Sequence, residues 1–553
     1  MQPGPRNIKR GHSGCRPCRR RGKKCDEAKP DCRACVRLRL ECSYGIVYSF
    51  RNIDTQSFQG NLDRTRALAS WSPSIYSQAH TGINRDARYL NHFISHVSHL
   101  LPTNGSGSQF TQETLKVPYL RSAALCISAS SLSMLNAQVQ TRSLPSDPRR
   151  SVWSPLANHA HSVQAQIYHD EVLAQYGGTA SLGIPSEAPG ILIALTILAY
   201  YHHASTNHLQ FRLAVWETVR FVSRHRESLT RSPSGAQALQ MWYRLCVSHR
   251  LGKPPALLLD GEGISAHGPN LYPDSLEALY LGCIMGMSSD DLIYDILIKT
   301  IEIRSRIVVF KCVAGIAGVS EESRNIGGVA HGLLNRFIGP EDAPDKWNEA
   351  QEGFVRGSHL QGLLEVQRER LGVWKSRLRE TQSPDSPAPF PRHRDAMNAL
   401  YSVLCDMMFY EAESDKKPSK HTQNVLQILS TLNLSDSVTF DIYTFSLTEV
   451  LLQLSVLPKS TDLFNYILDD LWPRLESSGR GYEHSHYPTH LVKRIIGLIA
   501  GYWDRGRNVR FVLPAVREDT PKTKLLNVEG ELGVVVCGRN LDGAHFVERV
   551  ALP

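Results

Sequence analysis

The sequence predicts a small metal-stabilised module at the N-terminus, a disordered linker and a large all-α domain. Three observations predict this organisation. Six of the twelve cysteines fall within residues 15–42, residues 46–85 are rich in Ser, Gln, Asn, Arg and Gly, and apolar residues after them mostly repeat at helical spacing. With 553 residues, the chain is long enough to bury a sizeable core.

The first element is defined by two copies of the spacing C-x2-C-x6-C, formed by Cys15, Cys18, Cys25, Cys32, Cys35 and Cys42. A pair of cysteines two residues apart can close on one tetrahedral metal, and thiolate sulfur suits zinc. Each of two tetrahedral zinc ions takes four ligands, and His12 alone could not complete two separate sites. Two of the six sulfurs must therefore bind both metals, which predicts a zinc binuclear cluster.

A disulfide framework is the alternative for closely spaced cysteines. Residues 1–10 carry charges and two prolines but no apolar segment typical of a secretory signal. The other six cysteines are scattered singly among apolar residues, as is typical of buried thiols in a reducing compartment. We therefore favour metal binding.

Positive charge is concentrated in the same segment. Residues 1–50 contain thirteen Lys and Arg against four Asp and Glu, a balance of +9 that equals the formal charge of the whole chain. Such a field predicts a polyanionic partner. A nuclear import signal alone is the alternative for the basic run between Cys18 and Cys25, and the two roles are compatible.

The spacings of the six cysteines resemble those of the fungal zinc binuclear-cluster transcription factors. So do the run Cys18-Arg19-Arg20-Arg21-Gly22-Lys23-Lys24-Cys25-Asp26 and Pro30 before Cys32. The resemblance covers roughly residues 11–45 and implies a DNA-binding module with two zinc ions. In that family the first cysteine of each half bridges the metals, which carries over to Cys15 and Cys32. Cys18 and Cys25 would complete one site, and Cys35 and Cys42 the other.

The resemblance also implies which side chains contact DNA. In the family a short helix follows the first cysteine of each half, and the end of the first helix enters the major groove. This implies DNA contacts by Arg19, Arg20, Arg21, Lys23 and Lys24, with Arg21 as the reader of guanine, and phosphate contacts by Arg33, Arg37 and Arg39. We expect a GC-containing, CGG-like triplet. Gly22 stands where many relatives carry a lysine, and this departure can change the preferred triplet.

In chain order, we expect a disordered basic arm (1–10), the cluster (11–45), the linker (46–85), an all-α domain (86–506) with a Pro-rich break near 381–391, and a C-terminal extension (507–553). The arrangement, together with Tyr89-Leu90-Asn91-His92-Phe93, resembles the helical regulatory domain of the same family. That domain would contact the transcription machinery or co-regulators. No coiled-coil heptads follow the cluster, so homodimerisation, if it occurs, is expected through the helical domain.

Apolar periodicity predicts a first helix through Leu90 and Val97 that Pro102 ends. Further helices are predicted near 115–138, 155–176, 187–203, 289–312, 358–380, 393–412, 421–432, 437–456 and 488–504. We expect Gly177-Gly178 to close the helix at 155–176, and Ser289-Asp290-Asp291 to start that at 289–312.

Residues 507–553 differ in composition from the helical region before them. Val509, Phe511 and Val512, and later Val534, Val535 and Val536, favour strands. We expect either a small strand pair packed on the helical body or an extension without regular structure.

Motifs of enzymes are missing from the sequence: there is no G-x-S-x-G, P-loop or dinucleotide-binding fingerprint, so no enzyme is expected. Three histidine groups lack the usual ligand spacings and are interpreted as surface histidines: His484, His486 and His490; His159, His161 and His169; His202, His203 and His208.

Apolar stretches such as 191–201 are about half the length of a membrane span, and no membrane partner is expected.

These observations predict a nuclear, sequence-specific DNA-binding transcription regulator, directed to RNA polymerase II, with double-stranded DNA and the transcription machinery or co-regulators as partners. The alternative is a zinc-stabilised basic module that binds an acidic protein partner without sequence-specific DNA binding. Salt and sequence dependence of DNA binding separate the two.

Overall fold

The protein is described by a computed structural model that divides into two compact units, Met1–Ala79 and His80–Pro553. The described residues are 17–18, 25–26, 28, 32–40, 42, 82–102, 114–135, 138–144, 147–156, 158–180, 187–204, 208–248, 277–338, 356–381, 390, 392–413, 419–457, 461–477, 489–514 and 533–552. None of the described helices combines the length and the apolar character that a membrane span requires.

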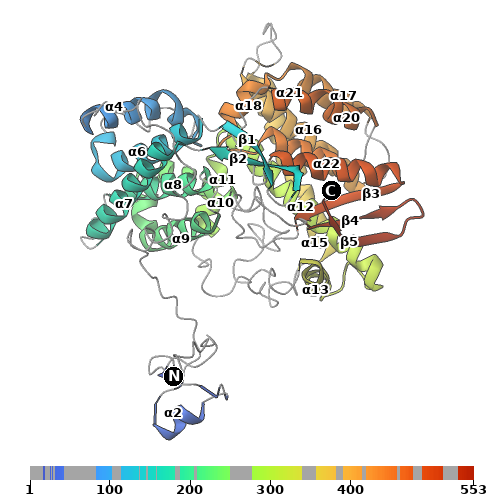
Figure 1. The fold of residues 1–553 in the computed structure, drawn as a ribbon, viewed down its shortest axis with the longest axis horizontal. Helices are drawn as coiled ribbons and strands as arrows, with labels where there is room; N and C mark the ends of the chain where they lie inside the picture. Colours follow the sequence, from blue (N-terminus) through green and yellow to red (C-terminus); the bar gives the residue numbers. More distant parts are fainter. Residues whose placement is uncertain are drawn as a thin grey trace, which may run out of the picture. The chain divides into compact units, whose positions relative to one another are not determined.

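The first unit contains one helix of five residues, α2 (Arg33–Arg37), among its described residues (Figure 1). It starts at Cys32, whose backbone is extended and whose sulfur accepts a hydrogen bond from the amide of Cys35. A small buried group of cysteines, Cys18, Cys32 and Cys35, replaces the apolar core that so short a segment lacks.

The second unit begins with helices that pack pairwise. They are α4 (Gly82–His92), the π-helix η2 (Phe93–Val97), α5 (Ser98–Leu100), the 3-10 turn η4 (Thr114–Lys116), α6 (Pro118–Leu135), α7 (His159–Ala180), α8 (Ala188–Ala204), α9 (His208–Thr230), α10 (Pro233–Ser248) and α11 (Glu277–Met285). Helix α6 packs against α4, α7 and α8, and α8 packs against α9 and α10. Because α8 is surrounded in this way, nearly all of its side chains are buried.

The longest helix, α12 (Ser289–Ala317), is the centre of the rest of the unit. It contacts helices α10, α13, α15 and α16 and the C-terminal strands. The helices that follow it are α13 (Ile326–Ile338), α15 (Gly357–Thr381), α16 (His393–Glu413), α17 (Ser419–Thr431), α18 (Leu434–Phe440), α19 (Leu447–Ser455), α20 (Thr461–Asn465), the π-helix η8 (Tyr466–Leu471), α21 (Trp472–Ser477) and α22 (Thr489–Asp504). One continuous apolar core runs through the unit, from Tyr89 to Leu552.

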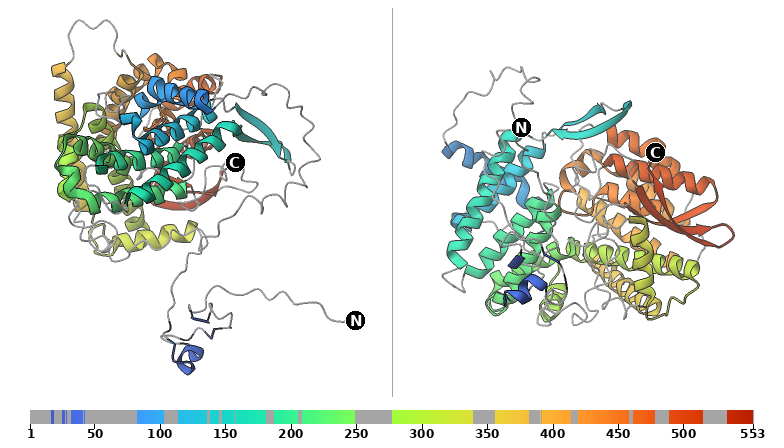
Figure 2. Two further views of the ribbon diagram at one scale, coloured as in Figure 1. Left: turned by 90° about the vertical axis from the view of Figure 1, so that its left-hand side faces the viewer. Right: turned by 60° about the horizontal axis from the view of Figure 1, so that its bottom comes forward.

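Two antiparallel sheets complete the unit. Strands β1 (Gln138–Leu144) and β2 (Asp147–Leu156) form a hairpin. Strands β3 (Arg507–Pro514), β4 (Gly533–Asn540) and β5 (His545–Ala551) lie side by side in that order, drawn in red in Figure 2. The three-stranded sheet packs on α12 and α22, and the β4 residues Val534–Cys537 are fully buried.

A mostly helical body after an N-terminal cysteine cluster confirms the predicted fold class. The hairpin β1–β2 was not predicted within the helical region, nor were α9, α10, α11, α13, α20 and α21. The tail forms three strands, where at most a pair was expected. The arm 1–10, residues 46–81 of the linker and most of the Pro-rich break lie outside the described residues, and α4 begins at Gly82, within the predicted linker.

Two predicted helix boundaries and one predicted cap were wrong. Helix α7 continues through Gly177-Gly178 to Ala180, because glycine weakens a helix without forbidding another turn. Ser288, one residue earlier than expected, caps α12 by accepting from the amide of Asp291 at 3.1 Å. The predicted helix 437–456 is two helices, because the carboxylate of Asp441 accepts from the amide of Leu447 at 3.1 Å between them.

Candidate metal centre and nucleic-acid interface

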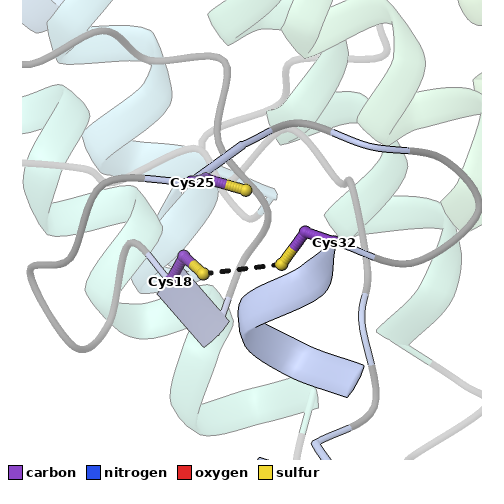
Figure 3. Close-up of side chains that lie close together, drawn as sticks. All are labelled: Cys18, Cys25 and Cys32. Atoms are coloured by element: carbon purple, nitrogen blue, oxygen red, sulfur yellow. Dashed lines mark hydrogen bonds between the residues drawn. The ribbon is translucent and has the colours of Figure 1, made fainter. Parts of the chain in front are cut away.

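Five of the six predicted zinc ligands lie among the described residues, and their sulfurs form two groups. Cys18, Cys25 and Cys32 make one group, and Cys32, Cys35 and Cys42 the other. Within each group all Sγ atoms lie within 4.8 Å of one another. Cys32 is therefore common to both, and Figure 3 shows the first group converging on one point. Cys15 lies outside the described residues.

The sulfur separations suit a shared metal. The Sγ atoms of Cys18 and Cys32 are 3.7 Å apart. A disulfide would bring the sulfurs to about 2.05 Å, whereas two thiolates on one tetrahedral zinc ion lie about 3.8 Å apart, given Zn–S bonds of about 2.3 Å. The donor set and its spacing thus fit zinc and argue against the disulfide framework.

Backbone amides support the sulfurs as thiolates. The amide of Cys35 donates to the Sγ of Cys32 at 3.4 Å, and the amide of Cys32 donates to the Sγ of Cys42 at 3.4 Å. Cys32 is also the N-cap of α2, where the positive end of the helix dipole favours negative charge. The local fold therefore stabilises the charged form that binds metal.

Asp26 links the two halves of the cluster. Its carboxylate accepts from the amide of Arg33 at 3.2 Å and lies 4.0 Å from the Nε of the same residue. The Arg33 side chain is nevertheless 94% exposed, so the ion pair is weak and the guanidinium is accessible to an anion. The spacing of the cysteines gave no sign of this link.

The end of α2 carries the other two predicted phosphate contacts, Arg37 and Arg39, both exposed. The amide of Leu40 donates to the carbonyl of Cys35 at 3.0 Å, and the amide of Arg39 to that of Val36 at 3.2 Å. These two bonds form a Schellman motif, in which Arg39 takes the left-handed position with φ of 49°. Glycine usually occupies that position, so the arginine is held there against its backbone preference.

The predicted major-groove residues Arg19, Arg20, Arg21, Lys23 and Lys24 lie outside the described residues. What sequence reasoning missed is an apolar strip beside the arginines: Val36, Leu38 and Leu40 are 62%, 40% and 39% exposed. The alternation of valine or leucine with arginine over residues 36–40 is the sequence signal that could have revealed it.

Comparison with known families decides what the cysteine cluster is. Residues 13–46 match the model of the fungal Zn(2)-Cys(6) binuclear cluster domain. The chain carries a fungal Zn(2)-Cys(6) binuclear cluster domain. Such a domain binds two zinc ions, and the two sulfur groups that share Cys32 agree with that stoichiometry.

A curated relative carries a similar segment. The chain is 51% identical over 36 residues to Sterol uptake control protein 2 of Saccharomyces cerevisiae. The match covers 6% of this chain and 4% of the relative, so the two proteins are alike over little more than the length of a binuclear cluster domain. No solved structure matches the chain.

The three histidine groups were interpreted as surface histidines, and this was wrong for His202, which is buried with 8% of its surface exposed. His161 lies 2.7 Å from the hydroxyl of Tyr89, and His203 packs edge-on against Phe211. His484 and His486 lie outside the described residues. His169 and His202, from two different groups, are instead brought together across α7 and α8.

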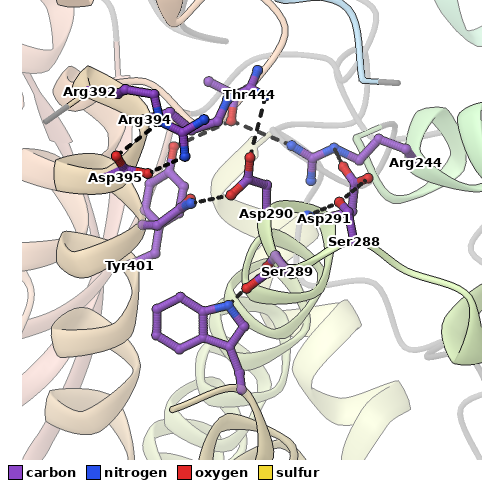
Figure 4. A network of polar contacts seen from close by, with 12 residues as sticks. Arg244, Ser288, Ser289, Asp290, Asp291, Arg392, Arg394, Asp395, Tyr401 and Thr444 are labelled. Atoms are coloured by element: carbon purple, nitrogen blue, oxygen red, sulfur yellow. Dashed lines mark hydrogen bonds and ion pairs between the residues drawn. The ribbon is translucent and has the colours of Figure 1, made fainter. Parts of the chain in front are cut away.

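Polar side chains also gather at the N-terminus of α12 (Figure 4). Asp290 accepts from Asn398 of α16 at 2.7 Å, and Asp291 pairs with Arg244 of α10 at 3.5 Å. The indole of Trp374 in α15 donates to the carbonyl of Ser289 at 2.9 Å. These contacts join α10, α12, α15 and α16, so we assign them a structural role in holding the helical body together.

Proposed function

We propose that this protein is a nuclear transcription regulator whose binuclear cluster domain reads a duplex DNA sequence. The observation that carries the proposal is Cys32, common to two convergent sulfur groups in a strongly basic segment. Cys15 and Cys32 bridge the two zinc ions in this proposal; Cys18 and Cys25 complete one site, and Cys35 and Cys42 the other. Zinc supplies most of the folding free energy of so small a module.

The basic residues of the cluster make two kinds of DNA contact in this proposal: contacts that read bases and contacts to phosphates that position the protein. Arg19, Arg20, Arg21, Lys23 and Lys24 face the major groove, and Arg21 binds guanine O6 and N7 through its two-pronged guanidinium. Arg33, Arg37 and Arg39 contact phosphates, which the 94% exposure of the Arg33 side chain supports. The expected site is a CGG-like triplet, which Gly22 can alter by letting the backbone approach the groove more closely.

The helical body has the regulatory role in this proposal. The surface of this body binds the transcription machinery or co-regulators of RNA polymerase II, or a second copy of the chain. The apolar core keeps the body folded. The carboxyl-terminal sheet is part of the same core and belongs to that body.

In vitro selection of duplex DNA by the full chain, at physiological salt, tests the proposal. Zinc-loaded protein should enrich one GC-containing triplet, and a chelator should abolish the enrichment, because the reading surface folds only around its metals. Arg21→Ala should relax the preference at one guanine, since a bidentate arginine contact discriminates by about 1–3 kcal/mol.

Arg6→Ala is the matched control, because it removes the same charge outside the cluster and should leave the selected sequence unchanged. Binding that depends on salt alone, with no sequence enriched, would contradict the proposal.

A second candidate function is favoured by one observation. The exposed strip Val36, Leu38 and Leu40 alternates with Arg37 and Arg39, a surface suited to an acidic protein segment with apolar side chains. Replacing the three apolar residues with Ser should leave the selected DNA sequence intact if DNA is the main partner. If the protein is instead an interaction module, the same variant loses its partner while no DNA sequence is ever enriched.

A further inference from the structure

His169 of α7 and His202 of α8 face each other through their Nε2 atoms, which are 3.2 Å apart. The His202 side chain is buried, with 8% of its surface exposed, and the His169 side chain is 12% exposed. Two buried imidazoles rarely meet nitrogen to nitrogen without a proton or a cation between them. Either a hydrogen bond or a shared cation therefore joins His169 and His202.

The Nδ1 atom of His169 has two polar neighbours on its own helix: a carboxylate oxygen of Asp170 at 3.0 Å and the amide nitrogen of Gln166 at 3.3 Å. When Nδ1–H donates to Asp170, Nε2 presents a lone pair to His202. The same carboxylate oxygen accepts from the amide of Gln166 at 2.8 Å, and the hydroxyl of Tyr201 donates to that glutamine at 3.3 Å. In metal-binding histidines, the ring nitrogen that does not bind the metal usually donates its hydrogen to a carboxylate, a backbone carbonyl or water.

The ring geometry suits a common cation better than a straight hydrogen bond. The ring centres of His169 and His202 are 4.9 Å apart, and the ring planes are inclined by 73°. A straight N–H···N bond with the same nitrogen separation would place the ring centres about 5.5 Å apart. If both nitrogens bind one zinc ion, with Zn–N bonds of about 2.05 Å and an N–Zn–N angle of about 103°, the nitrogens lie about 3.2 Å apart. The two ring centres are then about 5.0 Å apart. The observed ring-centre distance of 4.9 Å matches the second arrangement, and a hydrogen bond with the same nitrogen separation reproduces it only when bent.

We propose that His169 and His202 bind one divalent transition-metal cation of the zinc type between α7 and α8. Imidazole nitrogen suits zinc, copper and nickel, and water would complete the coordination, because no third ligand from the described residues is close enough to both nitrogens. Entry is from the side of Asp170, whose side chain is 65% exposed. Burial, followed by the neighbouring His169, lowers the pKa of His202 to about 3, so the ring is neutral at physiological pH.

This site is separate from the cysteine cluster, since its ligands belong to the second unit. Helices α7 and α8 touch each other only lightly and are held together mainly through α6, which packs on both. A cation shared by His169 and His202 would therefore add a direct link between two helices of the body. It would also make the stability of the body depend on free metal concentration.

The test measures zinc bound to the full chain after equilibrium dialysis against buffered micromolar zinc. Wild-type protein should bind one zinc ion more per chain than His169→Gln or His202→Gln. Asp170→Asn keeps both ligands but weakens the support of Nδ1, so it should bind that zinc about 10–100-fold more weakly. His99→Gln removes an exposed histidine and should match the wild type.

A second measurement covers the case in which a ligand variant folds poorly. Added zinc should raise the unfolding temperature of the wild-type body, and should do so less in Asp170→Asn, because binding to the folded state alone stabilises it. Equal zinc content in wild type and both ligand variants, or an unfolding temperature that does not respond to zinc in wild type, would overturn the proposal.

Discussion

Arg39 occupies a backbone conformation that arginine disfavours, and no hydrogen bond from the described part of the chain holds its side chain there. The Schellman motif that ends α2 needs a left-handed residue, and glycine would satisfy it at lower energy. A strained residue at a binding surface often marks a side chain kept for its contacts.

Arg39→Gly should therefore separate folding from binding. The variant should bind zinc more tightly, by about 1 kcal/mol, because the strain of the left-handed arginine is removed. Its DNA affinity should fall uniformly across sequences, and the salt slope should shrink by about one, because one phosphate contact is lost. Chelator competition and DNA titrations at several salt concentrations measure the two effects. Arg39→Ala is the control: it loses the charge without relieving the strain, so a gain in zinc affinity there would refute the argument.

Cys32 differs from the other described cysteines in belonging to both sulfur groups. Cys32→Ser should cost both zinc ions, because a sulfur shared by two metals completes neither site once it is gone. Metal analysis of the full chain measures this loss. Cys126→Ser, at a buried thiol of the helical body, should leave the cluster zinc unchanged. If Cys32→Ser retained one tightly bound cluster zinc, a bridging role for Cys32 would be wrong.

The cysteine spacing predicted the metal ligands because x2 and x6 intervals can bring sulfurs within reach of one ion, and five of the six sulfurs lie in two convergent groups. The same reasoning could not find Asp26 or the apolar strip at Val36, Leu38 and Leu40. Those depend on how the halves pack, which no local spacing encodes. The pair His169 and His202 was missed for the same reason, since 33 residues separate its members along the chain.

Among the elements, α12 carries an ion cluster inside the core. The carboxylate of Asp295, with 1% of its side chain exposed, lies 3.1 Å from the Lys299 ammonium and 2.7 Å from a guanidinium nitrogen of Arg370 in α15. The hydroxyl of Tyr243 in α10 donates to the same carboxylate at 3.3 Å. One carboxylate thus compensates two cations and links three helices.

Asp295→Ala should destabilise the helical body by about 3–5 kcal/mol, because the buried Lys299 and the partly buried Arg370 lose their partner. Denaturant unfolding followed by far-UV circular dichroism measures the change. Asp395→Ala is the matched control, since Asp395 pairs at 2.7 Å with Arg392, whose side chain is 70% exposed, and the loss there should be below about 1 kcal/mol. Equal effects of the two variants would show that burial does not govern the Asp295 cluster.

We expect helix α4 to become less stable as the pH falls. Burial, followed by His96, Arg88 and His161, lowers the pKa of His92 to about 4 from its ordinary 6.5. Folding therefore favours the neutral ring: the stabilisation is complete above pH 6.5, declines as the pH falls below 6.5 and is lost by about pH 4. The protection factors of the α4 amides, which remove the intrinsic pH dependence of exchange, should fall between pH 7 and pH 5 more in wild type than in His92→Gln. The same pH dependence in both proteins would contradict this assignment.

Long helices with many buried residues were the elements that the sequence predicted well. Helix α8 and helix α12 are long apolar segments, and their predicted ranges differ from the observed ones by a few residues. Helix α9 was missed because arginine, histidine and glutamate interrupt its apolar positions, and its burial comes from α8. The hairpin β1–β2 was missed because polar residues occupy both strands, which leaves no alternation to detect.

At the scale of the whole molecule, the two units have separate cores. Among the described residues, the cluster core consists of cysteines with Ala34, and the body core contains no residue before Tyr89. The charge is divided in the same way, because the excess of +9 resides in residues 1–50 and the rest is neutral overall.

Removing zinc with a chelator should therefore abolish sequence-specific DNA binding while most of the helical signal remains. The cluster depends on metal for its fold, whereas the body is stabilised by burial of apolar side chains. Far-UV circular dichroism and DNA binding measured on the same chelated sample test this. A large loss of helical signal on chelation would show that the body needs the cluster in order to fold.

The three-stranded sheet has a consequence for how the protein is made in the cell. The sulfur of Cys312 in α12 contacts the carbonyl of Gly538 in β4 across 226 residues of chain. At about 5–20 residues per second, a ribosome takes roughly 10 to 45 seconds to synthesise that interval. During this time the face of α12 that the strands will cover is exposed to solvent and to chaperones. Any premature stop before β4 would leave that face permanently open, and such a product should be captured by quality control instead of accumulating as a shorter regulator.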